Sequence, residues 1–282
     1  MGRKFRSRSP ASVLAELGYW HKKGFRRFDF MDDTFAQDRQ RVLDICAGIE
    51  RAGLTDSTFS VSQGMRAHLA DKPLLTKMYA AGFRELGFGV ESANDHVLRA
   101  ARKGQILRHI HEAVQAATEI GFEVGLFFMV GMPGETIDDV RESFAFALKY
   151  PVRYANFYNI IPYPGTELYN QIQARGALLA DPDEYLNETN TQRQVPLFAT
   201  PTLSVQERIE LLAESKRISR QVEHRFRSHQ LRRLGPLGRC ISALVTMDGL
   251  YPFLRKIGRH AVIHRTVRSV LDRLQPGPRI AT

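Results

Sequence analysis

Short apolar runs alternate with amphipathic segments through the first 180 residues of the chain. The run from Val124 to Val130 carries no charge, as expected of a strand buried on both faces of a parallel sheet. Between such runs, apolar residues recur at helical spacing, for example Val42, Ile45 and Ile49 in the segment 38–51. The pattern predicts five strands, at residues 25–31, 58–61, 85–90, 124–130 and 154–161.

The predicted strands recur at intervals of roughly 30 to 40 residues, which is the size of a βα unit. Such alternation favours a parallel sheet with right-handed crossovers. A closed eight-stranded barrel typically needs about 250 residues, whereas the pattern stops near residue 176. We therefore predict an α/β fold with about five parallel strands, arranged as a partial (βα) barrel or an open doubly wound sheet. We expect this core at residues 1–180, a polar linker at 181–203 and a basic helical C-terminal region at 204–282.

Composition and cysteine usage narrow the class of protein. Hydrophobic residues make up 43% of the chain and charged residues 25%, as in globular proteins with a sizeable core. The basic N-terminus is followed by no apolar segment of the kind found in secretory signals. The two cysteines, Cys46 and Cys240, lie far apart in the sequence, so we expect a cytoplasmic protein with reduced thiols.

The net charge of +10 is concentrated in the C-terminal region. From residue 208 onward there are 16 Lys and Arg against 5 Asp and Glu. Such a tail suits nucleic acid, an anionic membrane surface or an acidic partner, or it is a solvated helical face. It lacks the interleaved aromatics that stack on bases, so nucleic acid is disfavoured. Its apolar positions suit peripheral membrane contact or a lid over the barrel.

Glycine and polar residues follow the predicted strands, at the edge of the sheet where α/β proteins bind ligands. The central strand stops at Gly131-Met132-Pro133-Gly134, where the missing Cβ of glycine lets the backbone approach a ligand closely. Asp32-Asp33, Glu91-Ser92 and Pro162 follow other strands. The alternative is an ordinary turn in which Gly and Pro only end the strand.

Five motifs together resemble a known family. RSRSP, FDFMDDTF, GFGVES with Leu98 and Lys103 after it, FFMVGMPGET and IPYPGT occur in this order between residues 3 and 180. The set is similar to the radical S-adenosylmethionine superfamily, most closely to the branch whose members often carry a cobalamin-binding domain. The resemblance implies a six-stranded partial barrel. It also implies S-adenosylmethionine bound to a [4Fe-4S] cluster at the carboxyl ends of the strands.

The resemblance also implies roles for individual residues. Asp32 and Asp33 fall where the family binds the methionine ammonium, and Glu91, followed by Ser92, falls at the ribose position. Lys103 falls where a basic residue holds the methionine carboxylate. The stretches expected to border the adenine are Gly131, Met132, Pro133, Gly134, Ile161 and Pro162.

Each of these residues also has a structural interpretation. Asp33 could simply cap the following helix, and Glu91 and Lys103 could be surface charges. Arg66 could face the substrate or serve as a structural ion-pair partner, and the pattern does not separate the two. Tyr163 is a low-ranking substrate candidate that suits packing better than chemistry.

One departure from the family concerns the cluster. Family members hold it with three cysteines spaced C-x3-C-x2-C, because thiolates ligate iron–sulfur clusters, and this chain has no such loop. Cys46 lies in a predicted helix and suits a small core residue. We therefore expect a chain truncated downstream of the cluster loop and first strand, inactive in radical chemistry as written. Cobalamin would belong only to a longer parent chain.

Three functional hypotheses remain open. The first is the core of a radical S-adenosylmethionine-type enzyme that acts on an organic or lipid-like substrate. The second is a cluster-less protein that binds S-adenosylmethionine or serves as a scaffold. The third is a membrane or nucleic-acid adaptor that uses the basic tail. In every case an uncovered sheet edge near Tyr19, Trp20, Phe28 and Phe30 favours oligomerisation.

Overall fold

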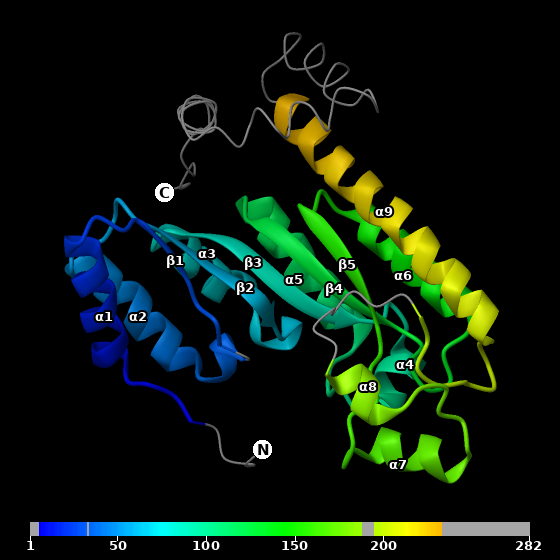
Figure 1. Ribbon diagram of the computed structural model, residues 1–282. Helices are drawn as coiled ribbons and strands as arrows, with labels where there is room; N and C mark the ends of the chain where they lie inside the picture. The colour runs from blue at the N-terminus through cyan, green and yellow to red at the C-terminus, as the bar shows by residue number, and fades with distance from the viewer. Residues whose placement is uncertain (1–5, 33, 188–194, 233–282) are drawn as a thin grey trace.

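A single parallel sheet organises the protein. The computed structural model describes residues 6–32, 34–187 and 195–232, and over these residues it shows five strands in the order β1-β2-β3-β4-β5 (Figure 1). All neighbouring pairs are parallel, so the predicted α/β half-barrel is confirmed. The strands are β1 (Arg27–Asp29), β2 (Thr58–Met65), β3 (Phe83–Glu91), β4 (Glu123–Val130) and β5 (Tyr154–Asn159).

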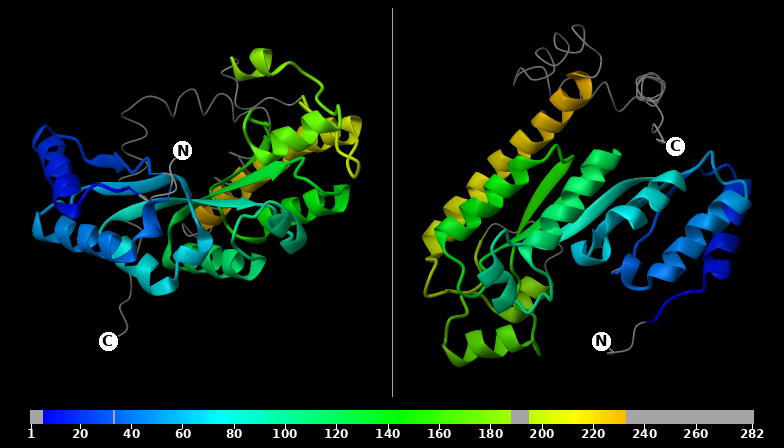
Figure 2. Two further views of the ribbon diagram at one scale, coloured as in Figure 1. Left: turned by 90° about the horizontal axis from the view of Figure 1, so that it is seen from below. Right: turned by 180° about the vertical axis from the view of Figure 1, so that it is seen from behind.

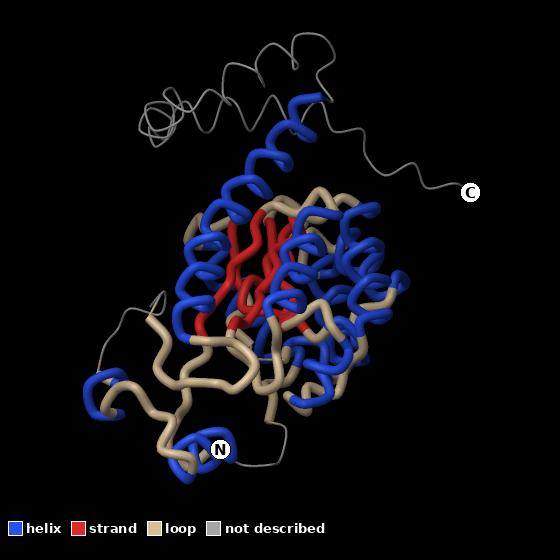
Figure 3. The backbone as a smooth tube through the Cα atoms, turned by 90° about the vertical axis from the view of Figure 1, so that its right-hand side faces the viewer, coloured by secondary structure: helices blue, strands red, loops and turns tan. Residues whose placement is uncertain are grey.

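Helices cover one face of this sheet and leave the other concave (Figures 2 and 3). The covering layer consists of α2 (Arg39–Arg51), α3 (Lys72–Ala80), α5 (Leu107–Ile120) and α6 (Ile137–Lys149), and α1 (Pro10–Lys22) packs beside α2. Three short helices, α4 (Asp95–Ala100), α7 (Glu167–Ala174) and α8 (Pro182–Leu186), gather near the carboxyl ends of the strands (Figure 1). The 3₁₀ turns are η1 (Phe35–Gln37) and η2 (Ala67–Leu69).

Local signals in the sequence explain where the helices begin. Ser9, Asp38 and Asn94 each accept a hydrogen bond from the backbone two or three residues further on, as N-caps do. Thr136 and Asp139 form a reciprocal capping box at the start of α6. Val42, Ile45 and Ile49 of α2 are completely buried between that helix and the sheet, as their spacing requires.

The long helix α9 (Val205–Arg232) closes the side of the sheet next to β5. It runs against the direction of that strand (Figure 1). Near its middle, the hydroxyl of Ser219 donates a hydrogen bond of 2.6 Å to the carbonyl of Ala155 in β5. The helical start predicted at Ser204 is thus observed. The further basic helices predicted at 235–275 lie outside the described residues.

The segment predicted as a linker carries ordered structure where it is described. It contains α8, and Leu197, Phe198 and Leu203 beyond it are buried. Leu178 and Phe198 form an antiparallel bridge. Leu178, Leu197 and Phe198 belong to a small second core at the carboxyl end of the sheet. Its buried members are Val97, Met132, Ile160, Ile172, Tyr185, Leu197 and Phe198.

At the opposite edge, β1 pairs with β2 and with no second strand of the described chain. Of the aromatic residues predicted near this edge, Tyr19 and Trp20 are exposed. Phe30 is buried and Phe28 stacks on Phe59. Within the part of the chain that the structure describes, no helix has the length and apolar character needed to cross a membrane.

Candidate functional site

The concave face of the half-barrel encloses a cavity of about 840 Å³. Volumes of about 300 to 1,000 Å³ are typical of small-molecule sites. It extends from Arg153, at the amino end of β5, to Glu91, at the carboxyl end of β3. The lining residues are Ser62, Gln63, Gly89, Glu91, Phe127, Arg153, Tyr154, Asn156, Tyr158, Glu223, Phe226 and Arg227.

Strand alternation places most of these side chains. In β5, Tyr154, Asn156 and Tyr158 face the cavity, whereas the residues between them are buried toward the helices. In β4, Phe127 and Met129 are only half-buried. The expectation that this strand is buried on both faces is therefore wrong for its second half, because the concave face is not covered by a helix layer.

Two predicted cofactor residues meet at the rim of the cavity. Lys103 Nζ lies 2.6 Å from Glu91 Oε1, and the two side chains are 32% and 16% exposed. Glu91 itself lines the cavity. Ser92 is buried next to it, and its hydroxyl has no partner in the structure. The rim thus offers a carboxylate and an ammonium to a ligand.

Unusual backbone geometry positions this ion pair. Glu91 (φ 65°) and Arg102 (φ 52°) are the two non-glycine residues of the described chain with a left-handed backbone. Such conformations cost about 1 kcal/mol or more and cluster at functional sites. The amide of Gln105 donates a 2.7 Å hydrogen bond to the carbonyl of Gly89, which holds the chain after α4 against the end of β3.

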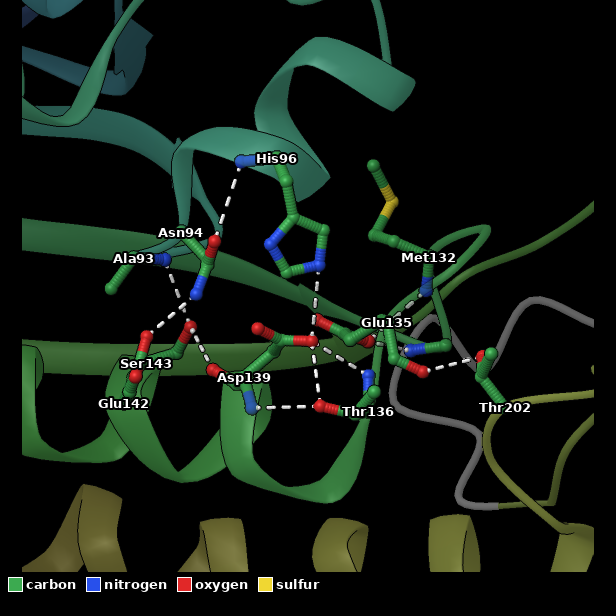
Figure 4. A network of polar contacts seen from close by, with 11 residues as sticks. Ala93, Asn94, His96, Met132, Glu135, Thr136, Asp139, Glu142, Ser143 and Thr202 are labelled. Atoms are coloured by element: carbon green, nitrogen blue, oxygen red, sulfur yellow. Dashed lines mark hydrogen bonds and ion pairs between the residues drawn. The ribbon is translucent and has the colours of Figure 1, made fainter.

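Polar contacts connect the segment after β3 to α6 (Figure 4). The backbone N–H of Ala93 donates to Ser143 Oγ at 2.9 Å, and Asn94 Nδ2 donates to Glu142 Oε2 at 2.6 Å. His96 Nε2 lies 3.3 Å from Asp139 Oδ2, the carboxylate of the capping box. These contacts fix the segment that carries Glu91.

The turn after β4 is closed by its own glutamate. The Glu135 carboxylate is buried and accepts hydrogen bonds from the N–H groups of Gly131 (2.6 Å) and Met132 (3.1 Å). Burial raises the pKa of Glu135 to about 7, against the effect of these hydrogen bonds. The buried guanidinium of Arg208 packs against Gly131, where a Cβ would lie 2.8 Å from Arg208 Cζ.

The other predicted site residues that the structure describes do not line the cavity. Asp32 Oδ1 is 3.8 Å from Arg41 Nη2, and Asp33 lies outside the described residues. Arg66 is the residue before η2 and Tyr163 is exposed, and neither lines the cavity. The stretches expected to border the adenine are partly used in packing, because Met132 and Ile161 join the second core and the carbonyl of Pro162 accepts from Tyr185.

A cluster-binding site does not form from the described residues. Cys46 is buried in α2, and burial raises the pKa of its thiol to about 12, which suits the predicted core role. Across 6–32, 34–187 and 195–232, no group of three or more His, Cys, Asp or Glu is arranged to hold a metal ion. Cys240 lies outside those ranges.

Several lining residues are not among those predicted from the sequence. The alternation of Tyr154, Asn156 and Tyr158 with smaller or apolar residues is a readable signal for one open face. Gln63 lies beyond the predicted end of its strand. Glu223, Phe226 and Arg227 come from α9, and nothing in their local sequence indicates that they reach the barrel.

Comparison with known proteins agrees with this architecture. The chain is 32% identical over 179 residues to an uncharacterized methyltransferase of Pyrococcus horikoshii, covering 63% of this chain and 38% of the relative. It is 28% identical over 193 residues to the cytidylyl-2-hydroxyethylphosphonate methyltransferase of Streptomyces wedmorensis, covering 66% and 35%. Each match therefore spans little more than a third of the relative's length.

Solved structures share the fold. One is the radical S-adenosylmethionine methyltransferase TsrM from Kitasatospora setae with cobalamin and a [4Fe-4S] cluster bound, which superimposes with a TM-score of 0.57 at 20% identity. That alignment covers 64% of this chain and 36% of TsrM. Coproporphyrinogen III oxidase of Escherichia coli gives a TM-score of 0.51 at 15% identity, covering 78% and 48%.

The family assignment rests on the sequence model of the radical SAM superfamily, which matches residues 1–147, more than half of the chain. The matched region contains β1 to β4, the Glu91–Lys103 ion pair and the turn closed by Glu135. The chain belongs to the radical S-adenosylmethionine superfamily.

Proposed function

We propose that this chain is the S-adenosylmethionine-binding half-barrel of a methyltransferase-type enzyme that acts on a small organic or lipid-like substrate. The observation that carries this proposal is the Glu91–Lys103 ion pair at the rim of the concave cavity. Methyltransferases among the relatives support the reaction class. The alternative is that the chain is a scaffold that binds no S-adenosylmethionine, and the titration below distinguishes the two.

The rim suits the chemistry of S-adenosylmethionine. A carboxylate can accept hydrogen bonds from both hydroxyls of a vicinal diol, which fits Glu91 to the ribose. An ammonium pairs with a carboxylate, which fits Lys103 to the methionine end of the ligand. Without ligand these two side chains satisfy each other at 2.6 Å. Binding of S-adenosylmethionine would therefore replace the Glu91–Lys103 ion pair by one ligand contact to each side chain, so the electrostatic cost of breaking the pair is small.

The residues present do not fit an iron–sulfur cluster. Thiolates are needed as ligands, and the sequence has only Cys46, which is buried in α2, and the distant Cys240. In the superfamily the cluster supplies the electron for reductive cleavage of S-adenosylmethionine, which amino-acid side chains cannot supply. We therefore propose that this chain, by itself, binds S-adenosylmethionine without cleaving it.

Isothermal titration with S-adenosylmethionine tests the site. We expect the wild-type chain to bind and Glu91→Ala and Lys103→Ala each to weaken binding about tenfold or more, because each removes a charge-assisted contact. Glu167→Ala is the matched control, since it removes an exposed carboxylate that pairs with the neighbouring Arg102. No wild-type binding, or binding that both site variants leave unchanged, would favour the scaffold alternative.

A second experiment tests the cluster. The purified chain is incubated anaerobically with iron, sulfide, a reductant and S-adenosylmethionine, and 5′-deoxyadenosine is measured by chromatography. We expect none above the level of a sample without protein. Its formation would contradict the proposal that this chain does not cleave the cofactor.

A further inference from the structure

Aromatic rings on the concave sheet lie directly on glycines. A Cβ added to Gly125 would lie 2.2 and 2.3 Å from the ring atoms Cζ and Cε2 of Tyr154, and one added to Gly87 would lie 2.7 Å from Phe127 Cε2. Both separations are far shorter than carbon–carbon van der Waals contact, which is about 3.5 to 4.0 Å. Only glycine therefore lets these two rings sit so low against the backbone of the sheet.

Together with Tyr158, these rings form a continuous surface. The centroid of Phe127 is 6.0 Å from that of Tyr154 and 6.3 Å from that of Tyr158, and all three residues line the cavity. Each is only half-buried, so part of each ring remains open to the cavity. We call Phe127, Tyr154 and Tyr158 the aromatic floor. Phe226 of α9 adds a fourth ring to the same cavity.

The polar groups around the floor favour an uncharged ligand. Arg153 is already paired with two carboxylates, Glu85 and Glu123. Arg227 forms an ion pair with Glu223 at 3.0 Å. The side-chain amides of Gln63 and Asn156 complete this part of the lining and provide hydrogen-bond donors and acceptors, whereas the Ser62 hydroxyl already donates to Asp29. A flat ring with polar edges can both stack on the floor and form hydrogen bonds with these side chains, whereas a multiply charged anion can do neither.

We propose that the aromatic floor is the substrate subsite and that it binds a flat, conjugated ring system with hydrogen-bonding edges. The cofactor would occupy the Glu91–Lys103 rim at the carboxyl end of β3, which adjoins the floor because Glu91 pairs with Phe128, the residue after Phe127. This inference rests on the proposed function and adds the chemical class of the substrate to it. Stacking of a flat ring on such side chains contributes about 1 to 3 kcal/mol per ring, or roughly 5- to 150-fold in affinity.

Two neutral lactams of similar size provide the probes: 2-quinolone, which is flat, and its perhydro analogue, which is not. Saturation-transfer NMR gives a dissociation constant for each compound on the intact chain. We expect 2-quinolone to bind at least about fivefold more tightly. Equal binding of the two compounds, or binding of neither, would overturn the proposal.

Variants of the floor localise the binding. Phe127→Leu and Tyr154→Leu should each weaken 2-quinolone binding about fivefold or more, because each removes a stacking ring. Phe127→Tyr should retain it, which separates loss of the ring from loss of the fold. Tyr163→Leu is the control, since Tyr163 is exposed and lies outside the cavity lining. Equal binding by all four variants would overturn the proposal.

The same titrations repeated with saturating S-adenosylmethionine separate substrate from cofactor. Simultaneous binding of both compounds would support a substrate subsite. Displacement of 2-quinolone by S-adenosylmethionine would assign the floor to the adenine of the cofactor and refute the substrate assignment. Ring binding that persists in a chain unable to bind S-adenosylmethionine would count against the proposed function alone.

Discussion

Replacement of Glu135 by Gln should change how the stability of the protein depends on pH. The Glu135 carboxylate is 1% exposed, and its Oε1 has no hydrogen-bond partner in the structure. Burial raises its pKa from 4.5 to about 7. Because the folded state holds this proton more tightly than the unfolded state, deprotonation costs stability.

The size of the effect follows from the shift in pKa. Below pH 4.5 both states keep the proton, so the contribution of Glu135 to stability is complete. As the pH rises from 4.5 to about 7, the unfolded state releases its proton first and stability falls. With about 1.4 kcal/mol per pKa unit, the loss is about 3 kcal/mol, and it stays constant at higher pH.

Urea unfolding of wild type and Glu135→Gln, at steps from pH 4.5 to 7, measures this difference. Glutamine keeps an oxygen that can accept from Gly131 and Met132, but it does not titrate. Subtracting the two curves removes the opposite contribution of His68 and His111, whose pKa values burial lowers. A difference that does not change with pH, or that matches the exposed control Glu112→Gln, would refute the reasoning.

Three further predictions concern the core and the sheet edge. Iodoacetamide should leave Cys46 unmodified until the protein unfolds, because its buried thiol has a pKa of about 12; peptide mapping would show any native labelling and separate it from Cys240. Gly125→Ala should lower the free energy of unfolding by about 1 to 3 kcal/mol, because the added Cβ clashes with Tyr154. Gly18→Ala in α1 should raise it by up to about 1 kcal/mol, because alanine favours the helix and its Cβ meets no atom within 4 Å. Urea titration checks both signs. Because β1 pairs only with β2 among the described strands, we expect the chain to oligomerise through this edge; a single monomeric species in light scattering would contradict this.

Much of the fold could be predicted because the signals for it are local. Ser9 before Pro10 marks the start of α1, and the apolar spacing of Val42, Ile45 and Ile49 identifies α2. The second half of β2 could not be predicted in this way, because Ser62–Met65 has little strand propensity. It becomes a strand by pairing with β3, through a register shift between Val61 and Met65.

The candidate site was less accessible from sequence. The position of Glu91 after a strand marks it as a candidate, but the pattern does not indicate its contact with Lys103, because the two are twelve positions apart with α4 between them. Their contact depends on left-handed backbone at Glu91 and Arg102, and no residue pattern predicts that conformation in non-glycine residues. Lining residues on α9 depend on tertiary packing alone. By contrast, the cavity-facing residues of β5 follow from simple alternation.

The turn after β4 shows why a glycine motif alone does not identify a ligand site. Its glycines were expected to bring backbone groups close to a ligand. Two of its N–H groups instead bind Glu135, and the space beside Gly131 is occupied by Arg208 of α9. A ligand at this turn would therefore meet carbonyl groups and side chains rather than the N–H groups of Gly131 and Met132. Glu135 precedes Thr136, the N-cap of α6, so the chain that enters this helix also supplies the carboxylate that occupies the N–H groups of the turn.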